Sequence, residues 1–157
     1  MMPETEIAEV KTLAELEHVR KLLRSYQAEL PAQCRFADAE WQNLPGAYSA
    51  PGGTLLLATV SGQPAGCVGL RTFPLVGTCE MKRLYVAPIF RGRQTGRALV
   101  ERVISIARQL GYTRMRLDTH PLTMGAAVAL YRHVGFVEVP AFPVEAVEDL
   151  LYMQLPL

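Results

Sequence analysis

Between residues 79 and 119 the chain holds two strand-like runs joined by a glycine- and arginine-rich turn and an amphipathic helix. The first strand is CEMKRLYVA (79–87), the helix spans 96–110 with its apolar residues on one stripe, and TRMRLDT (113–119) is the second strand. A helix that connects two strands of one sheet crosses over the face of that sheet, so the two strands run parallel. The sequence therefore predicts an α/β fold built around a parallel crossover over residues 79–119.

Hydrophobic periodicity and turn residues predict the elements on either side of this crossover. In chain order they are a strand at 6–10, a helix at 12–30, a short helix at 38–44, strands at 54–60 and 65–73, and, after the crossover, a helix at 123–134 and strands at 136–139 and 150–155. This order predicts one mixed sheet of about seven strands with helices on both faces. The chain has no internal repeat, low-complexity tract or linker, so residues 1–157 are interpreted as a single domain.

The charge balance argues against partners that bind through a broad electrostatic field. Lysine plus arginine number 16 and aspartate plus glutamate number 15, which gives a formal net charge of +1. Such a surface has no overall attraction for nucleic acid or for an anionic membrane, so we expect neither as a partner, and any anion site must be local. No apolar run is long enough to span a bilayer, and the acidic start MMPETE is unlike a signal peptide.

The three cysteines, Cys34, Cys67 and Cys79, form no Cys-x-x-Cys pair. Two of them lie in apolar strand-like runs, as reduced and buried cysteines do, and their spacing does not match a metal site. We therefore expect a cytoplasmic protein that uses no metal.

The stretch VAPIFRGRQTGRAL (86–99) has the composition of a binding site for a phosphate ester. A helix N-terminus offers unpaired N–H groups and a partial positive charge. Two glycines let the backbone approach a bulky anion, and three arginines add full charges. A solvated basic turn would have the same composition. A P-loop and a dinucleotide-binding loop are excluded, because the Gly-Lys-Ser/Thr ending of the first and the Gly-x-Gly-x-x-Gly pattern of the second are absent.

Three motifs together resemble the GCN5-related N-acetyltransferase family. The family's pyrophosphate signature, Arg/Gln-x-x-Gly-x-Gly/Ala at the start of a long helix, is similar to RGRQTG (91–96). KRLYVAP (82–88) resembles the family's fourth strand, and ALYRHVGF (129–136) resembles its Tyr-x-x-x-Gly-Phe block. The resemblance implies the family's mixed sheet and an acyl-coenzyme A cofactor, with acetyl-CoA as the expected donor. The residues that it implies as cofactor contacts are Leu84, Tyr85, Val86, Arg91, Gly92, Arg93, Gln94, Thr95, Gly96 and Arg97.

Two positions depart from the family pattern. Gln94 stands where the middle glycine of the signature is expected, and Met124 stands where relatives often carry an asparagine, seven residues before Tyr131. Backbone N–H donation does not require glycine, so we expect a distorted or slightly weaker cradle at Gln94. At Met124 we expect one missing side-chain contact to the cofactor.

The resemblance also implies two catalytic residues. Glu80 occupies the position of the carboxylate that serves as general base in the histone-modifying members of the family, whereas many relatives use water chains instead. Tyr131 occupies the position of the tyrosine that hydrogen-bonds or protonates the coenzyme sulfur. Backbone N–H groups near Leu84–Val86 are the implied donors to the developing oxyanion. Two structural alternatives stay open. Glu80 could be an ion-pair partner of Lys82 or Arg83, and Tyr131 could be a buried helix aromatic.

The acceptor site is implied only in outline. In the family the first two helices and the loop after them wall the substrate cleft, and here that region offers Phe36, Trp41 and Tyr48 for an apolar-sided pocket. Trp41 is equally well explained as a helix anchor. His120 ends the second strand of the crossover, at the edge where α/β sheets bind ligands, and is an alternative base. The late segment 140–149 could cover the same cleft from the other side.

We therefore predict an acetyl-CoA-dependent N-acetyltransferase that acts by direct attack and without a metal. Its acceptor is expected to be a primary amine on a small molecule, an amino acid or a peptide. One alternative is a catalytically silent module that binds or senses acyl-CoA, which Gln94 and Met124 favour and the presence of both Glu80 and Tyr131 opposes. A second alternative is transfer of a different acyl group. A homodimer is left open.

Overall fold

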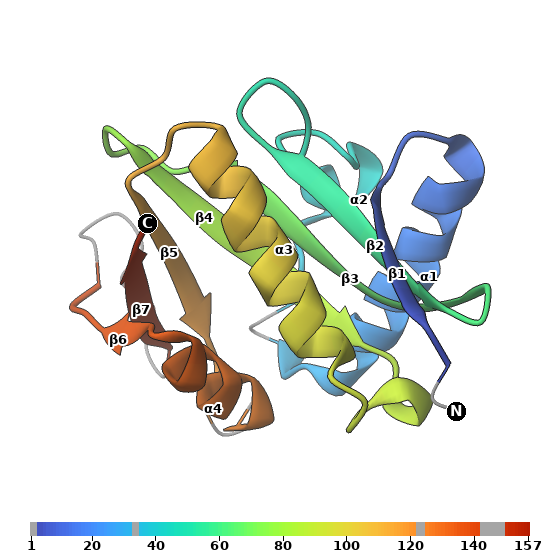
Figure 1. Ribbon diagram of the computed structural model, residues 1–157. Coiled ribbons are helices and arrows are strands. Elements are labelled where there is room, and N and C mark those ends of the chain that lie inside the picture. Colours follow the sequence, from blue (N-terminus) through green and yellow to red (C-terminus); the bar gives the residue numbers. More distant parts are fainter. Residues whose placement is uncertain (1–2, 33–34, 122–124, 142–149) are drawn as a thin grey trace.

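The computed structural model describes residues 3–32, 35–121, 125–141 and 150–157, in which one seven-stranded sheet carries helices on both faces (Figure 1). The strands are β1 (Thr5–Glu9), β2 (Thr54–Val60), β3 (Gln63–Thr72), β4 (Thr78–Val86), β5 (Arg114–Thr119), β6 (Val137–Glu138) and β7 (Leu151–Pro156). The helices are α1 (Leu13–Glu29), α2 (Asp38–Gln42), a 3₁₀ turn η2 (Pro88–Phe90), α3 (Thr95–Gln109) and α4 (Gly125–Val134). This is the predicted order of elements, and the predicted mixed α/β sheet is confirmed.

The sheet is continuous except between β4 and β5, which pair over only part of their length. The strand order runs β1-β2-β3-β4-β5-β7-β6, and every neighbouring pair is antiparallel except β4 and β5. The predicted parallel crossover is therefore present. β4 and β5 pair only from Thr78 with Arg114 to Glu80 with Arg116, so the two strands separate over their remaining length (Figure 1). The end of β4 thus has a free edge toward β5, beside the start of α3.

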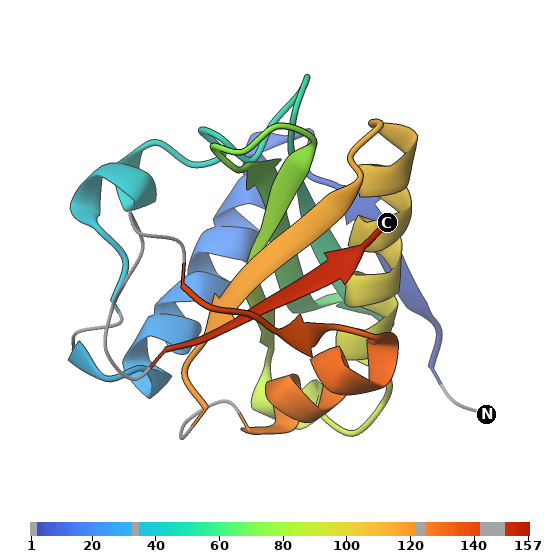
Figure 2. The same cartoon turned by 90° about the vertical axis from the view of Figure 1, so that its left-hand side faces the viewer.

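The inner strands supply a core to each face of the sheet. Leu56 of β2 packs in one cluster with Val103 of α3, and its neighbour Leu57 packs in another with Leu23 of α1. Successive side chains of a strand point to opposite faces, so α1 and α3 cover different sides of the sheet (Figure 2). α4 lies on the same side as α3, because Tyr131 belongs to the α3 cluster.

The turn between β2 and β3 is tighter than predicted. Ser61 and Gly62 have φ values of 51° and 78°, as a two-residue type I′ turn requires, and β3 already begins at Gln63. Pro64 therefore lies inside the strand, next to a register shift in its pairing with β2. An irregularity at the start of a strand tolerates proline, because the hydrogen-bond ladder is already interrupted there.

Other boundaries differ from the prediction by one or two residues. The strand predicted at 136–139 is reduced to Val137–Glu138, which pairs with Gln154 and Met153 of β7. The helix predicted at 123–134 is described from Gly125 onward, and its first two predicted residues lie outside the described part of the chain.

Two of the three cysteines are free and buried, as predicted. Cys67 lies in β3 and Cys79 in β4, and burial raises the pKa of each thiol to about 12. Cys34 lies outside the described residues. Within the described residues no cluster of three or more histidine, cysteine or acidic side chains could hold a metal ion, and no described helix is long and apolar enough to cross a membrane.

Candidate active site

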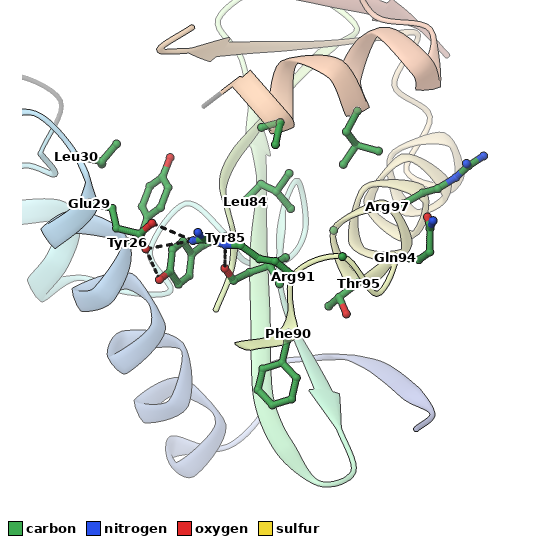
Figure 3. A pocket seen from close by; sticks show the side chains of 16 residues that line it. Tyr26, Glu29, Leu30, Leu84, Tyr85, Phe90, Arg91, Gln94, Thr95 and Arg97 are labelled. Carbon is green, nitrogen blue, oxygen red and sulfur yellow. Dashed lines mark hydrogen bonds and ion pairs between the residues drawn. The ribbon is translucent and has the colours of Figure 1, made fainter. Parts of the chain in front are cut away.

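A pocket of about 440 Å³, called the α3 pocket below, opens where β4 ends and α3 begins (Figure 3). Nine of the ten residues predicted to contact the cofactor line it, and Arg93 does not. Its full lining is Tyr26, Glu29, Leu30, Leu84, Tyr85, Val86, Phe90, Arg91, Gly92, Gln94, Thr95, Gly96, Arg97, Ala126, Ala127 and Leu130. The local turn and the two flanking helices α1 and α4 therefore enclose one space.

The first turn of α3 presents unpaired donors to this pocket. The first amide bonded within the helix is that of Ala98, which donates to the Gln94 carbonyl oxygen at 3.0 Å, so the amides before it have no intrahelical partner. Thr95 is only 2% exposed, and its hydroxyl has no hydrogen-bond partner among the described residues. An unpaired buried polar atom costs free energy, so this turn suits a ligand that accepts several hydrogen bonds.

Gln94 adopts the left-handed backbone conformation that usually favours glycine. It is the N-cap of α3 and lies in the left-handed region, with φ 65° and ψ 9°. The substitution therefore leaves the shape of the turn in place and adds backbone strain. Gly92 also has a positive φ of 78°, and nothing lies within 4 Å of where its Cβ would stand.

We expect Gln94→Gly to raise the free energy of unfolding by up to about 1 kcal/mol. The left-handed conformation costs a non-glycine residue about 1–2 kcal/mol, and the greater freedom of glycine in the unfolded chain offsets about 0.4–1 kcal/mol of that gain. Urea unfolding of the parent and the variant measures the difference. Ser105→Gly on the exposed, right-handed part of α3 is the control and should lose stability instead. If Gln94→Gly lowered the free energy of unfolding as much as this control does, the inference that Gln94 is strained would be wrong.

Arg91 is held in place by a network that crosses the α3 pocket. Its Nε donates to the Val86 carbonyl oxygen at 2.9 Å, and its terminal nitrogen lies 3.0 and 3.1 Å from the two carboxylate oxygens of Glu29 (Figure 3). The Tyr85 hydroxyl donates to the same carboxylate at 2.5 Å. Burial favours a higher pKa for Glu29, but the hydrogen bonds from Tyr85 and Arg91 outweigh it and hold the pKa below its usual range. Arg91 therefore points into the pocket with its charge partly compensated.

The other two arginines of the turn differ from each other. Arg97 lies on α3, where its Nε donates to Glu101 at 2.9 Å and a terminal nitrogen lies 3.2 Å from Nε2 of His133 on α4. The guanidinium of Arg93 lies 5.9 Å from the centre of the Phe90 ring and outside the pocket. Arg91 and Arg97 are thus the two cations that the α3 pocket offers to an anion.

A bulge in β4 shapes the inner end of the α3 pocket. Cys67 of β3 pairs with Tyr85 and Gly69 pairs with Lys82, so the single residue between them faces both Arg83 and Leu84. Arg83 has a φ of 61°, which is consistent with a bulge at this point. The bulge takes one residue of β4 out of the regular ladder directly beside Leu84, which lines the pocket.

Tyr131 of α4 lies beside this bulge. Together with Tyr26 and Leu84 it lines a narrow cavity of about 30 Å³. Its ring packs edge-on against Phe136 at a centroid distance of 5.8 Å, and its hydroxyl makes no hydrogen bond to any described residue. Burial, with smaller effects from Tyr26 and Asp118, raises the pKa of Tyr131 above its ordinary value, so the group stays protonated.

Glu80 lines a separate cavity of about 410 Å³ on the α1 side of β4, called the charged cavity below. Its carboxylate accepts a hydrogen bond from Arg71 Nε at 2.8 Å and lies 3.9 Å from Lys82 Nζ. Lys82 in turn lies 3.1 Å from Asp118 of β5. The ion pairing that was left open for Glu80 is therefore present with Lys82, and its nearer partner is Arg71 rather than Arg83.

The three cavities follow one another along β4. Tyr26 and Leu84 line both the α3 pocket and the narrow cavity, and Lys82 and Asp118 line both the narrow cavity and the charged cavity. Tyr131 belongs to the narrow cavity in the middle. This arrangement suits two reactants that enter from the two ends of this row of cavities and meet beside Leu84 and Tyr131.

Comparison with known proteins shows which protein family the chain belongs to. A model of the acetyltransferase (GNAT) family matches residues 16–136. The chain belongs to the GNAT family of acetyltransferases. This GNAT protein is 36% identical over 152 residues to an N-acetyltransferase from Schizosaccharomyces pombe, a match that covers 95% of this chain and 93% of that protein. It is also 36% identical over 103 residues to an IAA acetyltransferase from Azospirillum brasilense, covering 65% of this chain and 67% of that protein.

The fold of this GNAT protein matches solved structures over almost its whole length. An acetyltransferase of the GNAT family from Staphylococcus aureus superposes with a TM-score of 0.83 at 20% sequence identity, covering 98% of this chain and 99% of that one. The family match, the relatives and the fold together make this protein an acyltransferase.

The four residues suggested for the acceptor site of this acetyltransferase do not line any of the three cavities. Phe36 and Tyr48 are buried in the α1-side core, and Trp41 packs against the same cluster. The Arg83 guanidinium lies 3.8 Å from the centre of the Phe36 ring. His120 is buried at the end of β5. The structure thus places the three aromatic residues as packing groups around α2.

Sequence reasoning missed the part of the α3 pocket that comes from α1. Tyr26, Glu29 and Leu30 line it from one side, and Ala126, Ala127 and Leu130 of α4 line it from the other. One signal was available. Glu29 is the last residue of α1, where a negative charge is unfavourable to the helix dipole, so a cation nearby was to be expected.

Two further expectations fall on residues that the structure does not describe. Met124 lies outside the described part of the chain, as do residues 142–149 of the segment expected to cover the cleft.

Proposed function

We propose that this protein is an acetyl-CoA-dependent N-acetyltransferase that transfers an acetyl group to a primary amine by direct attack. The observation that carries the proposal is the α3 pocket, in which unpaired amides, the unpaired Thr95 hydroxyl and two arginines converge at one helix N-terminus. The narrow cavity that Tyr131 lines shares residues with this pocket and with the charged cavity, and so lies between them.

The residues of the α3 pocket fit a coenzyme A pyrophosphate. The Thr95 hydroxyl has a donor without a partner in the described structure, and the open space at Gly92 leaves the backbone accessible. Arg91 and Arg97 supply positive charge, and a helix N-terminus favours an anion. The end of β4, Leu84–Val86, would hold the pantetheine arm in the opening beside β5.

Bound acetyl-CoA would supply a thioester, whose carbon–sulfur bond breaks as the amine forms the new nitrogen–carbon bond. The chain then has three tasks. Glu80 takes the proton of the acceptor ammonium group from the side of the charged cavity. Backbone N–H groups at Leu84–Val86 donate to the acetyl oxygen. The protonated Tyr131 hydroxyl, which lies in the narrow cavity, donates to the departing sulfur.

A thiol-release assay tests this function. The protein is incubated with acetyl-CoA and a panel of amines, amino acids and peptides, and free coenzyme A thiol is measured; longer acyl-CoAs test the choice of acyl group. We expect thiol release that depends on at least one acceptor, with an acetylated amine as the second product. Tight acyl-CoA binding with no transfer to any acceptor would favour the silent binding module instead.

Glu80→Gln is expected to lower the rate at neutral pH with little change in affinity for acetyl-CoA. Deprotonating an amine of pKa near 10 at pH 7 costs about 4 kcal/mol, and the variant keeps the size of Glu80 but loses the group that accepts the proton. Activity should recover as pH rises, because the free-amine fraction then grows unaided. The pH–rate profiles of the parent and the variant on one good acceptor measure this.

Glu17→Gln is the matched control, since Glu17 forms an ion pair with Arg20 outside all three cavities. It should reproduce the parent's profile. A Glu80→Gln profile that coincides with the parent's at every pH would remove Glu80 from the mechanism and leave His120 or a water chain as the base.

We also propose that residues 1–157 form a single N-acetyltransferase domain that works in the cytoplasm. The two large core clusters pack against opposite faces of the same sheet, which supports one domain. The free, buried Cys67 and Cys79 suit a reducing compartment.

A further inference from the structure

The charged cavity contains both signs of charge, but its carboxylates already have partners. Glu80 accepts from Arg71 at 2.8 Å and faces Lys82 at 3.9 Å, and Asp118 lies 3.1 Å from Lys82. Glu40, at the edge of this cluster, accepts from Arg83 at 2.6 Å and from the Tyr48 hydroxyl at 3.2 Å. A cationic ligand would therefore have to compete with cations that the chain itself supplies.

Arg71 is the group in this cavity with hydrogen-bonding capacity to spare. Its Nε is bonded to Glu80, but its two terminal nitrogens donate no hydrogen bond to a described residue, and the Glu40 oxygen nearest to one of them is 3.7 Å away. The side chain is 30% exposed and lines the charged cavity. The bond to Glu80 and the Tyr48 ring, 5.7 Å from the guanidinium carbon, hold it in one orientation. The outer edge of a guanidinium matches a carboxylate in a two-point contact.

We propose that the acceptor is an amine that also carries a carboxylate, that is, a free amino acid, and that Arg71 binds this carboxylate. The inference rests on the proposed function, because it places the acceptor in the charged cavity. Lys82 and Asp118 stand at the junction with the narrow cavity, so the acceptor amine lies near Asp118 and Glu80, and the carboxylate lies toward Arg71. A diamine of the same length would place its second cation against Arg71 and Lys82, where it is repelled.

The test compares amino acids with the amines that they yield on decarboxylation. L-phenylalanine is paired with phenethylamine, L-methionine with 3-(methylthio)propylamine and L-lysine with cadaverine. The methyl ester of each amino acid replaces the carboxylate by an uncharged group, and all rates are compared per free amine because esterification lowers the pKa of the amine. The parent should show higher kcat/KM for the acids than for the paired amines and esters. In Arg71→Gln this acid-to-amine ratio should fall by about 10- to 150-fold, mainly through KM, as expected for the loss of one charge-assisted contact. A partly unfolded variant would lower both rates together and leave the ratio unchanged.

Two further variants sharpen the result. Arg71→Lys keeps the charge beside Glu80 but loses the planar fork, so its ratio should lie between those of the parent and Arg71→Gln. Arg20→Gln removes an arginine that also pairs with a glutamate, at 2.7 Å, but lies outside the cavities, and its ratio should equal the parent's. Calorimetric titration of the same acids and amines into the protein saturated with coenzyme A reads binding without turnover.

The outcomes separate this inference from the function on which it rests. Transfer to amines with no preference for the acids, or an unchanged acid-to-amine ratio in an Arg71→Gln protein that unfolds in urea like the parent, would overturn the role of Arg71 and leave the acetyltransferase intact. A preference for cadaverine or for a peptide would identify a cationic or peptide acceptor instead. No acceptor-dependent transfer together with no calorimetric binding of any acid would overturn both.

Discussion

Replacing Tyr131 by phenylalanine is expected to lower kcat by about 10- to 1,000-fold while leaving the free energy of unfolding unchanged. The span is that of one general-acid or hydrogen-bond contribution. The reason for unchanged stability lies in the structure. The ring is buried against Phe136, and its hydroxyl bonds to no described residue, so removing the oxygen keeps the packing and breaks no hydrogen bond in that part of the chain. Steady-state kinetics and urea unfolding of the same preparation measure the two quantities.

Tyr112→Phe is the matched control with the opposite expectation. The Tyr112 hydroxyl donates to the Gly52 carbonyl oxygen at 2.6 Å and lies 2.8 Å from the Thr72 hydroxyl, away from the α3 pocket and the narrow cavity. Its loss should cost about 0.5–1.5 kcal/mol of stability and leave kcat close to the parent value. If instead Tyr131→Phe unfolded early with normal specific activity, Tyr131 would be a core residue without a catalytic role.

Removing the two arginines of the α3 pocket is expected to weaken acetyl-CoA binding strongly. Each charge-assisted contact contributes about 1.5–3 kcal/mol, so Arg91→Ala and Arg97→Ala should each raise Kd by about 10- to 150-fold. Both losses of affinity should fall toward the lower end, because Glu29 and Glu101 already compensate part of the charge of Arg91 and Arg97. Calorimetric titration of acetyl-CoA measures the Kd of both variants. The increase in Kd should be smaller at higher salt, because these partly exposed charges are then screened.

Arg102→Ala is the control for net charge alone. Arg102 lies on the exposed side of α3 and does not line the pocket. It should leave Kd close to that of the parent. Equal losses in all three variants would mean that binding responds to overall charge rather than to a built phosphate site.

Much of the fold was predictable because its signals are local. The crossover rests on two strand runs and one amphipathic helix in unbroken succession, and the β2–β3 hairpin rests on Ser61 and Gly62. What the local pattern does not contain is the point at which two parallel strands separate. β4 and β5 pair over only three positions, and the strand sequences give no sign of it, because separation depends on what packs between them.

In the candidate site, too, the features formed by neighbouring residues were predictable and those formed by distant residues were not. The turn 91–97 and the Tyr-x-x-x-Gly-Phe block are contiguous in sequence, so nearly all of the predicted cofactor residues do line one pocket. The Arg91–Glu29 pair joins residues 62 positions apart, and the Arg71–Glu80 pair depends on the β3–β4 register, which contains a bulge. The aromatic residues 36, 41 and 48, which line none of the three cavities, illustrate a related difficulty. From the sequence alone, an aromatic residue that lines a cleft cannot be distinguished from one that anchors a short helix.

Titration of acetyl-CoA into the parent protein by calorimetry determines whether the α3 pocket binds the cofactor. We expect saturable binding at one site per chain, weakened by Arg91→Ala and Arg97→Ala and unaffected by Arg102→Ala. Absence of any saturable heat with acetyl-CoA or free coenzyme A, from protein that unfolds cooperatively in urea, would contradict this expectation.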